Sequence, residues 1–197
     1  MSSSTALGSG PRNDARITDT ATVIRVRRAV PADEPDVAAV QVRSWQWAYR
    51  GLLAQDYLDG LDPQAWAARY SFGRMGFALP ATHVAVDGAT VCGLVTTGLC
   101  RDPDLSNFGE VMAIYVDPAY VRRGVGRSLM HAARNRLRRV GFGWAALWVL
   151  DGNVAARRFY ERDGWGCDGA RRTSTYGGVA VDQVRYRLRL RPDIEPA

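Results

Sequence analysis

The sequence predicts a mixed α/β fold in which a mostly antiparallel central sheet carries helices on both faces. Three strand-like segments follow one another between residues 82 and 116, and Asp87-Gly88, a typical hairpin turn, separates the first two. Two later helical segments are each followed by another strand, as in helices that cross over a sheet. With 197 residues, 47% of them hydrophobic, the chain is long enough to bury the core of one such domain.

The N-terminal part is expected to contain a tail, one strand and several helices. Residues 1–22 are rich in Ser, Thr, Gly and Asp and predict a disordered tail, so that residues 23–191 form a single folded domain. Residues 23–30 alternate enough to be the first strand. Apolar and aromatic side chains then recur on one helical face over residues 37–49, and one or two shorter helices are expected within residues 52–70.

The remaining segments complete the order β-α-α-β-β-β-α-β-α-β-β. Short apolar runs bounded by turn residues predict the strands, and helical spacing ended by glycine predicts the helices. Strands are expected at residues 82–87, 90–100, 110–116, 144–150, 165–168 and 181–190, and helices at residues 124–140 and 154–162.

The glycine-rich loop that precedes the helix 124–140 predicts an anion site. It reads Arg122-Arg123-Gly124-Val125-Gly126-Arg127. Glycines let the backbone turn sharply and approach a ligand, and the first N–H groups of a helix have no partner within the helix. The helix dipole places positive charge at the same end, where phosphate is the usual guest. We therefore expect a diphosphate site at residues 122–127; the alternative is a helix start that needs its two glycines for packing.

Two other phosphate-binding motifs do not fit this loop. The dinucleotide fingerprint G-x-G-x-x-G needs a third glycine or alanine, but Leu129 occupies that position. The nucleoside-triphosphate loop G-x-x-x-x-G-K-[ST] needs a lysine, and all 26 basic residues of this chain are arginine.

Two blocks of the sequence resemble the GNAT superfamily of N-acetyltransferases. Residues 110–126 end in a loop similar to the family's [Q/R]-x-x-G-x-[G/A], with Val121 at its first position. This departure concerns one side-chain contact and not the backbone cradle. Residues 153–165 resemble the family's N-x-x-A-x-x-F-Y-x-x-x-G-[FW]. Because both blocks occur in the family's order, the resemblance covers about residues 23–190 and implies a GNAT-like fold.

The resemblance also implies an enzyme that moves the acetyl group of acetyl-CoA directly to a primary amine within a ternary complex. Acetyl-CoA would be the cosubstrate, and no metal is expected. Backbone N–H groups of the central strand would bind the thioester oxygen and the pantetheine, the loop would bind the diphosphate, and an asparagine would bond the pantetheine amides. These cofactor-binding residues are Ile114, Tyr115, Val116, Arg122, Arg123, Gly124, Val125, Gly126, Arg127 and Asn153.

Two residues are candidates for proton transfer because of their positions in the family's blocks. Glu110 would be the general base; a solvated carboxylate at this position, or a chain of water molecules as the base, are the alternatives. Tyr160 would protonate the leaving thiolate, because a phenol with a pKa of ~10 carries its proton at neutral pH. The alternative is a core tyrosine packed beside Phe159. His83 and His131 have no evident partner, so structural roles are favoured for both.

The distribution of charge favours a phosphate ligand over nucleic acid. The formal net charge is +6, but residues 121–162 carry ten arginines against two acids, whereas residues 50–120 carry four arginines against eight acids. Positive charge therefore surrounds the predicted diphosphate loop, although the arginines of residues 127–139 could also form a solvated helix face. A small-molecule amine is favoured over a protein as the acceptor, because the acidic half would attract a cation.

Neither a transmembrane segment nor a secretory signal is evident, so a cytoplasmic protein without a membrane partner is expected. The three cysteines are widely spaced, which indicates neither a disulfide framework nor a zinc site. A non-catalytic acyl-CoA-binding or sensor module of the same fold is the alternative function. Pairing of two copies through the last strands is a further expectation from the resemblance.

Overall fold

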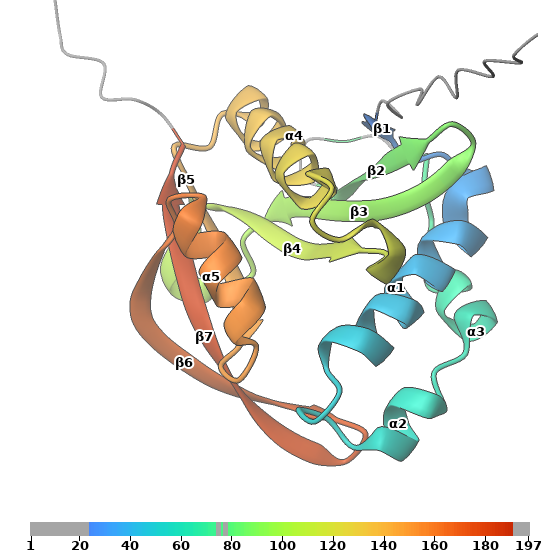
Figure 1. The fold of residues 1–197 in the computed structure, drawn as a ribbon. Helices are drawn as coiled ribbons and strands as arrows, with labels where there is room; N and C mark the ends of the chain where they lie inside the picture. The colour runs from blue at the N-terminus through green and yellow to red at the C-terminus, as the bar shows by residue number, and fades with distance from the viewer. Residues whose placement is uncertain (1–23, 74–75, 77–78, 191–197) are drawn as a thin grey trace, which may run out of the picture.

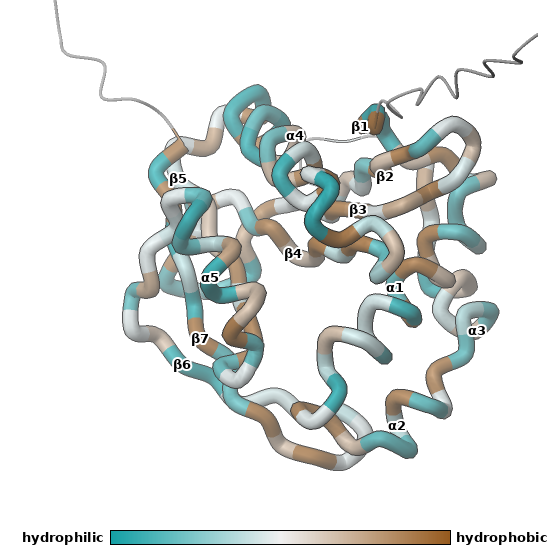
Figure 2. Tube along the Cα trace, viewed as in Figure 1, coloured by the Kyte–Doolittle hydropathy of each residue, from teal (hydrophilic) through white to brown (hydrophobic). Residues whose placement is uncertain are grey.

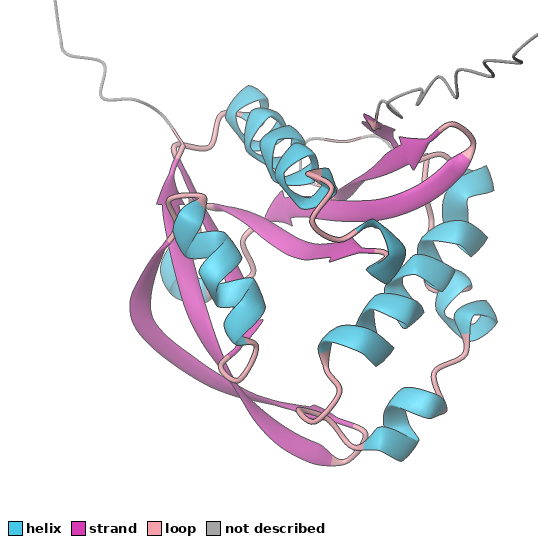
Figure 3. Cartoon of the chain, viewed as in Figure 1, coloured by secondary structure: helices cyan, strands magenta, loops and turns pink. Residues whose placement is uncertain are grey.

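The computed structural model describes residues 24–73, 76 and 79–190, which form one seven-stranded sheet with helices (Figure 3). The strand order is β1-β2-β3-β4-β5-β7-β6, and every neighbouring pair is antiparallel except β4 and β5, which are parallel. This confirms the predicted mixed α/β class with a mostly antiparallel sheet. The predicted tail, residues 1–22, lies outside the described residues. The strands are β1 (Arg25–Arg28), β2 (Ala81–Asp87), β3 (Thr90–Leu99), β4 (Gly109–Val116), β5 (Trp144–Leu150), β6 (Gly166–Tyr176) and β7 (Val179–Arg189).

Helices cover both faces of the sheet, as predicted (Figure 1). No helix in the described part of the chain combines the length and the hydrophobicity required to span a bilayer. One face carries α1 (Glu34–Ala48), α2 (Gln55–Asp59) and α3 (Pro63–Ala67), and the other carries α4 (Val125–Val140) and α5 (Val154–Arg162).

Side chains of β2 alternate between these two helical layers. Val84 and Val86 pack in a cluster with Val37 of α1, whereas Ala85 packs in the cluster that contains Leu129 of α4. Successive side chains of a strand point to opposite faces, so this alternation places one apolar layer on each side of the sheet.

α4 is held to the sheet by one apolar stripe. Val125, Leu129, Ala133 and Leu137 are buried, and their spacing of four residues keeps them on one side of the helix. In Figure 2 most of the α4 tube has hydrophilic colours, while β3 and β4 beneath it include hydrophobic stretches. Gly141, with φ 107°, ends the helix in a left-handed conformation, as the sequence predicts.

β4 and β5 pair over only two positions and then separate. Their parallel register joins Gly109 to Ala145 and Glu110 to Ala146, and no strand of the described structure pairs with residues 111–116 on this side. On its other side β4 remains paired with β3 to its end. The sheet therefore opens along most of β4.

Two strand boundaries differ from the prediction. β1 is shorter than the expected residues 23–30, and β6 extends well beyond the expected residues 165–168. β6 is an edge strand rich in Arg, Thr and Ser, and most of its side chains are exposed, so no hydrophobic alternation marks it in the sequence. Its register is also irregular around Gly169, which has φ 85°.

Gly93 allows α4 to lie close to β3, and we expect Gly93→Ala to destabilise the fold. A Cβ at this position would lie 2.9 Å from Leu129 Cδ1 and 2.9 Å from the Tyr115 carbonyl oxygen. The oxygen belongs to the backbone of β4 and cannot rotate away. The free energy of unfolding, measured by urea denaturation, should fall by ~1–3 kcal/mol, the usual cost of overpacking.

Gly143→Ala is the matched control, because its Cβ would meet no atom within 4 Å. It should change the free energy of unfolding by less than ~0.5 kcal/mol. Equal urea midpoints for the two variants would contradict the close packing of α4 on β3.

Candidate active site

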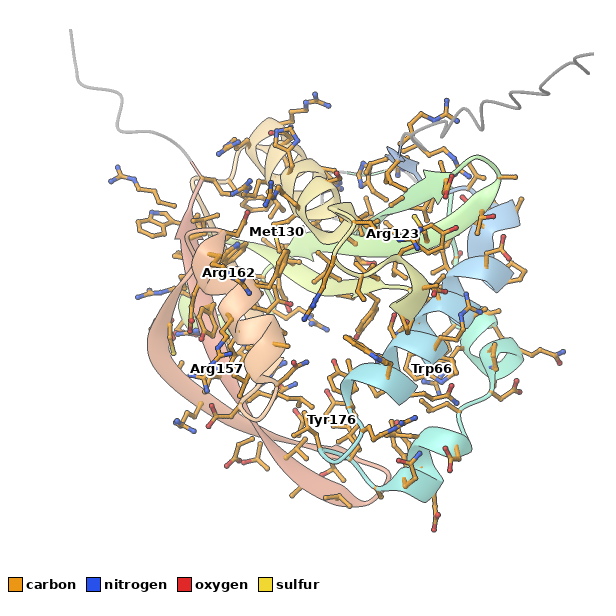
Figure 4. All side chains as sticks on the ribbon, viewed as in Figure 1. Trp66, Arg123, Met130, Arg157, Arg162 and Tyr176 are labelled. Atoms are coloured by element: carbon orange, nitrogen blue, oxygen red, sulfur yellow. The ribbon has the colours of Figure 1, made fainter. Side chains whose placement is uncertain are left out.

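A cavity of about 1160 Å³ lies where β4 and β5 separate. Its walls come from α1, β4, the loop before α4, β5, α5 and the β6–β7 hairpin; Figure 4 labels two lining residues, Arg162 of α5 and Tyr176 of the hairpin. Most of the residues predicted for the site meet here, although they come from separate parts of the chain. The predicted residues that line the cavity are Glu110, Ile114, Tyr115, Val116, Arg122, Gly124, Gly126, Arg127, Asn153 and Tyr160.

Two predicted residues do not line the cavity. Val125 is 1% exposed and belongs to the core beneath α4. Arg123 is exposed, and its guanidinium lies 5.3 Å from the centre of the Tyr120 ring. Neither side chain therefore forms part of the wall.

The loop before α4 has the backbone conformation of an anion site. Arg122 (φ 62°) and Gly124 (φ 82°) are left-handed, and Arg122 is the single non-glycine residue of the described chain with positive φ. Residues of alternating φ sign turn successive N–H groups toward one concave point, which suits an anion. No side chain of the described residues caps the N-terminus of α4, so its first N–H groups also remain unpaired. Loop and helix together present donors and positive charge to the cavity.

Close packing requires neither glycine of this loop, and backbone conformation requires one of them. A Cβ on Gly124 would meet nothing within 4 Å, so its φ of 82° is what requires glycine there. A Cβ on Gly126 would lie 3.5 Å from the Phe159 ring, an ordinary contact distance. The packing alternative considered from the sequence therefore does not explain this glycine pair.

β4 directs backbone donors into the cavity. The Asp117 N–H donates to the Cys92 carbonyl of β3 at 2.9 Å. Because the N–H groups of a strand point alternately to its two sides, those of Val116 and Ile114 point away from β3, toward the gap left by β5. On this side Ser44 of α1 donates to the Val116 carbonyl at 2.7 Å. The N–H groups of Ile114 and Val116 therefore face the cavity.

Glu110 is buried and bound by Arg101. Its side chain is 4% exposed, and its Oε1 accepts from Arg101 NH2 at 2.6 Å. Its Oε2 accepts from Arg101 Nε at 3.0 Å and from the Arg101 backbone N–H at 3.1 Å. The hydrogen bond to Glu110 raises the pKa of the Arg101 guanidinium. The solvated alternative for Glu110 is therefore wrong, and Arg101, which sequence reasoning missed, orients this carboxylate.

Tyr160 belongs to both the core and the cavity. It is 7% exposed and packs with Phe159, Trp165 and Tyr186, yet it also lines the cavity. Burial, with a smaller contribution from Tyr115, raises the pKa of Tyr160 above its ordinary value. The phenol therefore keeps its proton at neutral pH and above.

An aromatic group forms one end of the cavity, and sequence reasoning missed its assembly. The Trp45 ring centre lies 5.0 Å from that of Tyr49, 6.3 Å from that of Tyr115 and 5.5 Å from that of Tyr176. These residues come from α1 and its C-terminus, β4 and β6, so no local spacing reveals the group. Burial raises the pKa of Tyr115 to about 12. We call this part of the cavity the aromatic end.

Asn153 caps α5 and also lines the cavity. Its Oδ1 accepts from the Ala156 N–H at 3.1 Å, which satisfies one of the first donors of that helix. The amide Nδ2 group is left as the part of the side chain that could donate to a ligand.

The acidic residues of the loop after β3 and at the start of β4 are already paired. Asp102 and Asp104 lie 3.1 and 2.7 Å from the guanidinium of buried Arg185, and Glu110 is bound by Arg101. These carboxylates of residues 50–120 are therefore not free to attract a cationic acceptor, as the charge distribution led us to expect. A preference for a small amine needs another basis.

Two contacts join the α1–α2 layer to the far side of the gap. Tyr57 of α2 packs directly on Gly177 at the tip of the β6–β7 hairpin. A Cβ on Gly152, in the loop between β5 and α5, would lie 2.7 Å from Leu52 Cδ2, in the loop after α1. A helix and a loop of this layer thus touch the opposite side at two points.

Comparison with known proteins agrees with this geometry. A family model described as acetyltransferase (GNAT) family matches residues 39–165. A Mycobacterium tuberculosis protein named probable N-acetyltransferase is 31% identical over 174 residues, which is 84% of this chain and 93% of that protein. The crystal structure of the PaiA N-acetyltransferase of Thermoplasma acidophilum in complex with coenzyme A has a TM-score of 0.65 and 18% identity, and covers 85% of this chain and 99% of that one. The structure of yncA from Salmonella typhimurium with acetyl-CoA has a TM-score of 0.63 and 21% identity, over 88% and 98% of the two chains.

The family model spans more than half of the chain, and a relative above 30% identity covers most of it. Together with the seven-stranded sheet and the loop before α4, these matches confirm the resemblance inferred from the two sequence blocks. The chain therefore belongs to the acetyltransferase (GNAT) family and is an acetyl-CoA-dependent N-acetyltransferase.

Proposed function

We propose that the protein transfers the acetyl group of acetyl-CoA directly to a primary amine of a small molecule while both are bound in the cavity. The observation that carries this proposal is the continuity of the cavity from the uncapped start of α4, along the open side of β4, to the aromatic end. No cysteine is among the described residues that line it, so no thiol is at hand for a covalent acyl-enzyme. If each substrate enters from one end of this continuous cavity, the acetyl group and the amine would meet inside it and react directly.

The residues present fit acetyl-CoA, which supplies the acyl group as a thioester. The loop 122–127 would bind the diphosphate through its N–H groups, with Arg122 and Arg127 adding charged donors. The Asn153 Nδ2 group would donate to a pantetheine amide. The N–H groups of Ile114 and Val116 would bind the thioester oxygen and stabilise the negative charge that it gains in the transition state.

The acceptor amine must lose a proton before or as it reacts. At pH 7 a lysine-type amine with a pKa of ~10.4 is neutral in about one molecule in 2,500, a deficit of ~4.6 kcal/mol. Glu110 would accept this proton, directly or through water, since a carboxylate can accept more bonds than the three from Arg101. A bond forms between the amine nitrogen and the acetyl carbon as the carbon–sulfur bond breaks. Tyr160 would give its proton to the departing sulfur and regain one from solvent.

The contacts across the gap and the aromatic walls support a small acceptor over a folded protein. Tyr57 contacts Gly177 and Leu52 approaches Gly152, which joins the two sides of the gap, and aromatic rings form the walls at the aromatic end. Trp45, Trp148 and Tyr176 would contact the body of the acceptor. A slender amine with apolar surface suits these walls best.

The alternative is a non-catalytic acyl-CoA-binding module of the same fold. The observation that favours it is that Arg101 engages both oxygens of Glu110, which leaves the carboxylate fewer sites for an amine proton. The second of the two tests below separates this alternative from an enzyme.

Gly126→Glu tests the diphosphate site. Position 126 is the second residue of α4. The helix dipole stabilises a carboxylate at this position, but the carboxylate repels a diphosphate. Acetyl-CoA at ~100 times its dissociation constant should stabilise the unchanged protein by ~2.7 kcal/mol, a rise in Tm of about 5–10 °C for a chain of this size. The variant should keep its ligand-free Tm and lose most of the rise in a thermal-melt assay.

Gln55→Glu is the matched control, because it makes the same charge change at the start of another helix, α2, outside the cavity. It should retain the full rise in Tm. A full rise in Gly126→Glu as well would remove the loop before α4 from the cofactor site.

Tyr160→Phe tests the proton donor. It keeps the ring in the core and removes only the hydroxyl, so kcat should fall by ~10²–10⁴-fold while acetyl-CoA binding is retained. Because burial raises the pKa of Tyr160 above its ordinary value, kcat of the unchanged enzyme should show no decrease from this group up to about pH 9.5. Glu110→Gln should lower kcat, because it removes the proposed proton acceptor.

Steady-state assays with a panel of primary amines measure these effects. If Tyr160→Phe and Glu110→Gln both fold and both keep full turnover, the proposed roles of these residues in proton transfer are disproved. Tight binding of acetyl-CoA without turnover of any amine by the unchanged protein would favour the binding module.

A further inference from the structure

A second cavity, of about 820 Å³, lies between β1, β2 and the polar side of α4. Six arginines and two histidines line it, and the described lining residues include no aspartate or glutamate. From the sequence, the arginines of residues 127–139 could form a solvated helix face. A solvated face alone does not explain why these arginines line a cavity. We call it the basic groove and define it by Arg28, His83, Arg127, His131, Arg136 and Arg139.

Arg136 differs from the other arginines that are withdrawn from solvent. Five arginines of the described chain are buried or half-buried. Arg27, Arg134, Arg157 and Arg185 each form an ion pair with an aspartate. Arg136 forms no ion pair with any described residue and donates only to the Leu79 carbonyl, at 3.3 Å. Its charge is therefore the uncompensated one of this set.

Three buried nitrogen atoms of residues that line this cavity lack a hydrogen-bond partner among the described residues. They are Nδ1 of His83, NH1 of Arg136 and Nε of Arg134, whose NH1 is paired with Asp163. His83 lies in β2 on the face that carries α4, since it alternates with Val84, which faces α1. His83 and Arg136 therefore bring unpartnered nitrogen atoms to the groove from a strand and from a helix.

Burial lowers the pKa of both groups. For His83, Arg136, Arg28 and Arg139 lower it further, and for Arg136 the second cause is Arg28. A buried donor without a partner and a charge without a counterion each cost free energy. The groove therefore reduces stability as it stands, and an anion placed in it would satisfy the donors and the charge together.

We propose that the basic groove binds a small phosphate-bearing anion at a second site, separate from the diphosphate loop, with Arg136 and His83 as its inner donors. A phosphate group offers three acceptor oxygens, and guanidinium groups bind such oxygens in pairs. A hollow of this size favours a small ligand over the extended backbone of a nucleic acid, which needs a continuous exposed track.

Arg127 connects the groove to the proposed active site, because it lines both cavities. An anion in the groove would draw on the same guanidinium that the cofactor diphosphate uses. Each ligand should therefore weaken the other by the same factor, since coupling between two binding sites is reciprocal. The groove would then report the level of a phosphorylated compound to the acetyltransferase.

Isothermal titration calorimetry with inorganic diphosphate tests the site in full-length protein saturated with coenzyme A, which keeps the diphosphate loop filled. One diphosphate should bind per chain. Arg136→Gln should weaken this binding at least tenfold and should not lower Tm, because it removes a charge that burial disfavours. Arg50→Gln, an exposed arginine outside both cavities, is the matched control and should change the affinity less than twofold.

The pH dependence gives a second readout. The charged and titratable groups that face His83 in the groove are Arg28 of β1 and His131, Arg136 and Arg139 of α4. Burial and the positive charges of Arg136, Arg28 and Arg139 lower the pKa of His83, whereas a bound anion favours its protonated form. The affinity for diphosphate should therefore rise as the pH falls from 8 to 6, and His83→Gln should reduce this rise.

Three outcomes would overturn the proposal. Arg136→Gln could bind diphosphate as tightly as the unchanged protein. Diphosphate could bind only without coenzyme A and with an affinity that Arg136→Gln leaves unchanged, which would make the diphosphate loop its sole site. A 20-nucleotide DNA could bind with steep salt dependence while diphosphate does not bind, which would make the groove a nucleic-acid surface.

Discussion

The early separation of β5 from β4 is the constraint on which the rest of the structure depends. A strand without a neighbour leaves backbone donors and acceptors unpaired, and buried groups of this kind need other partners. α1 supplies part of the replacement, because Ser44 donates to the Val116 carbonyl and Arg43 pairs with Asp117 at 2.6 Å. The N–H groups that α1 leaves unused are those of Ile114 and Val116. The opening that shortens the sheet therefore also provides the donors of the proposed site.

Ion pairs join distant segments of the chain beside the cavity. Arg185 is buried and contacts Asp102, Asp104 and Asp168, which ties the loop after β3 to β7. Arginine suits these bridges because its planar guanidinium binds two carboxylate oxygens at once. A count of charges along the chain treats the same aspartates as surplus negative charge, although in the fold they are structural partners of distant arginines.

Local sequence patterns were enough to predict the elements that depend on local spacing, such as α4. The helical spacing of Val125, Leu129 and Leu137 and the glycine after the helix set α4, and the glycine-rich loop marked its start. Contacts between distant segments were beyond reach. The capture of Glu110 by Arg101 depends on how a loop folds back, and β6 has no hydrophobic alternation because it is an exposed edge. The aromatic residues around Trp45 and Tyr49 could be interpreted from the sequence as a pocket wall or as core, but the addition of Tyr115 and Tyr176 from two other elements could not be foreseen.

The aromatic end and the loop before α4 rest on different parts of the fold, which can change independently in evolution. The aromatic end takes its rings from α1 and its C-terminus, β4 and β6, and the short helices after α1 pack against it. The loop before α4 shares none of these segments and rests on the large core beneath that helix. With the acceptor bound at the aromatic end as proposed, substitutions in the short helices or the hairpin tip would alter which amine is accepted without touching the cofactor loop. Selection would then diversify the acceptor while the acyl donor stays the same.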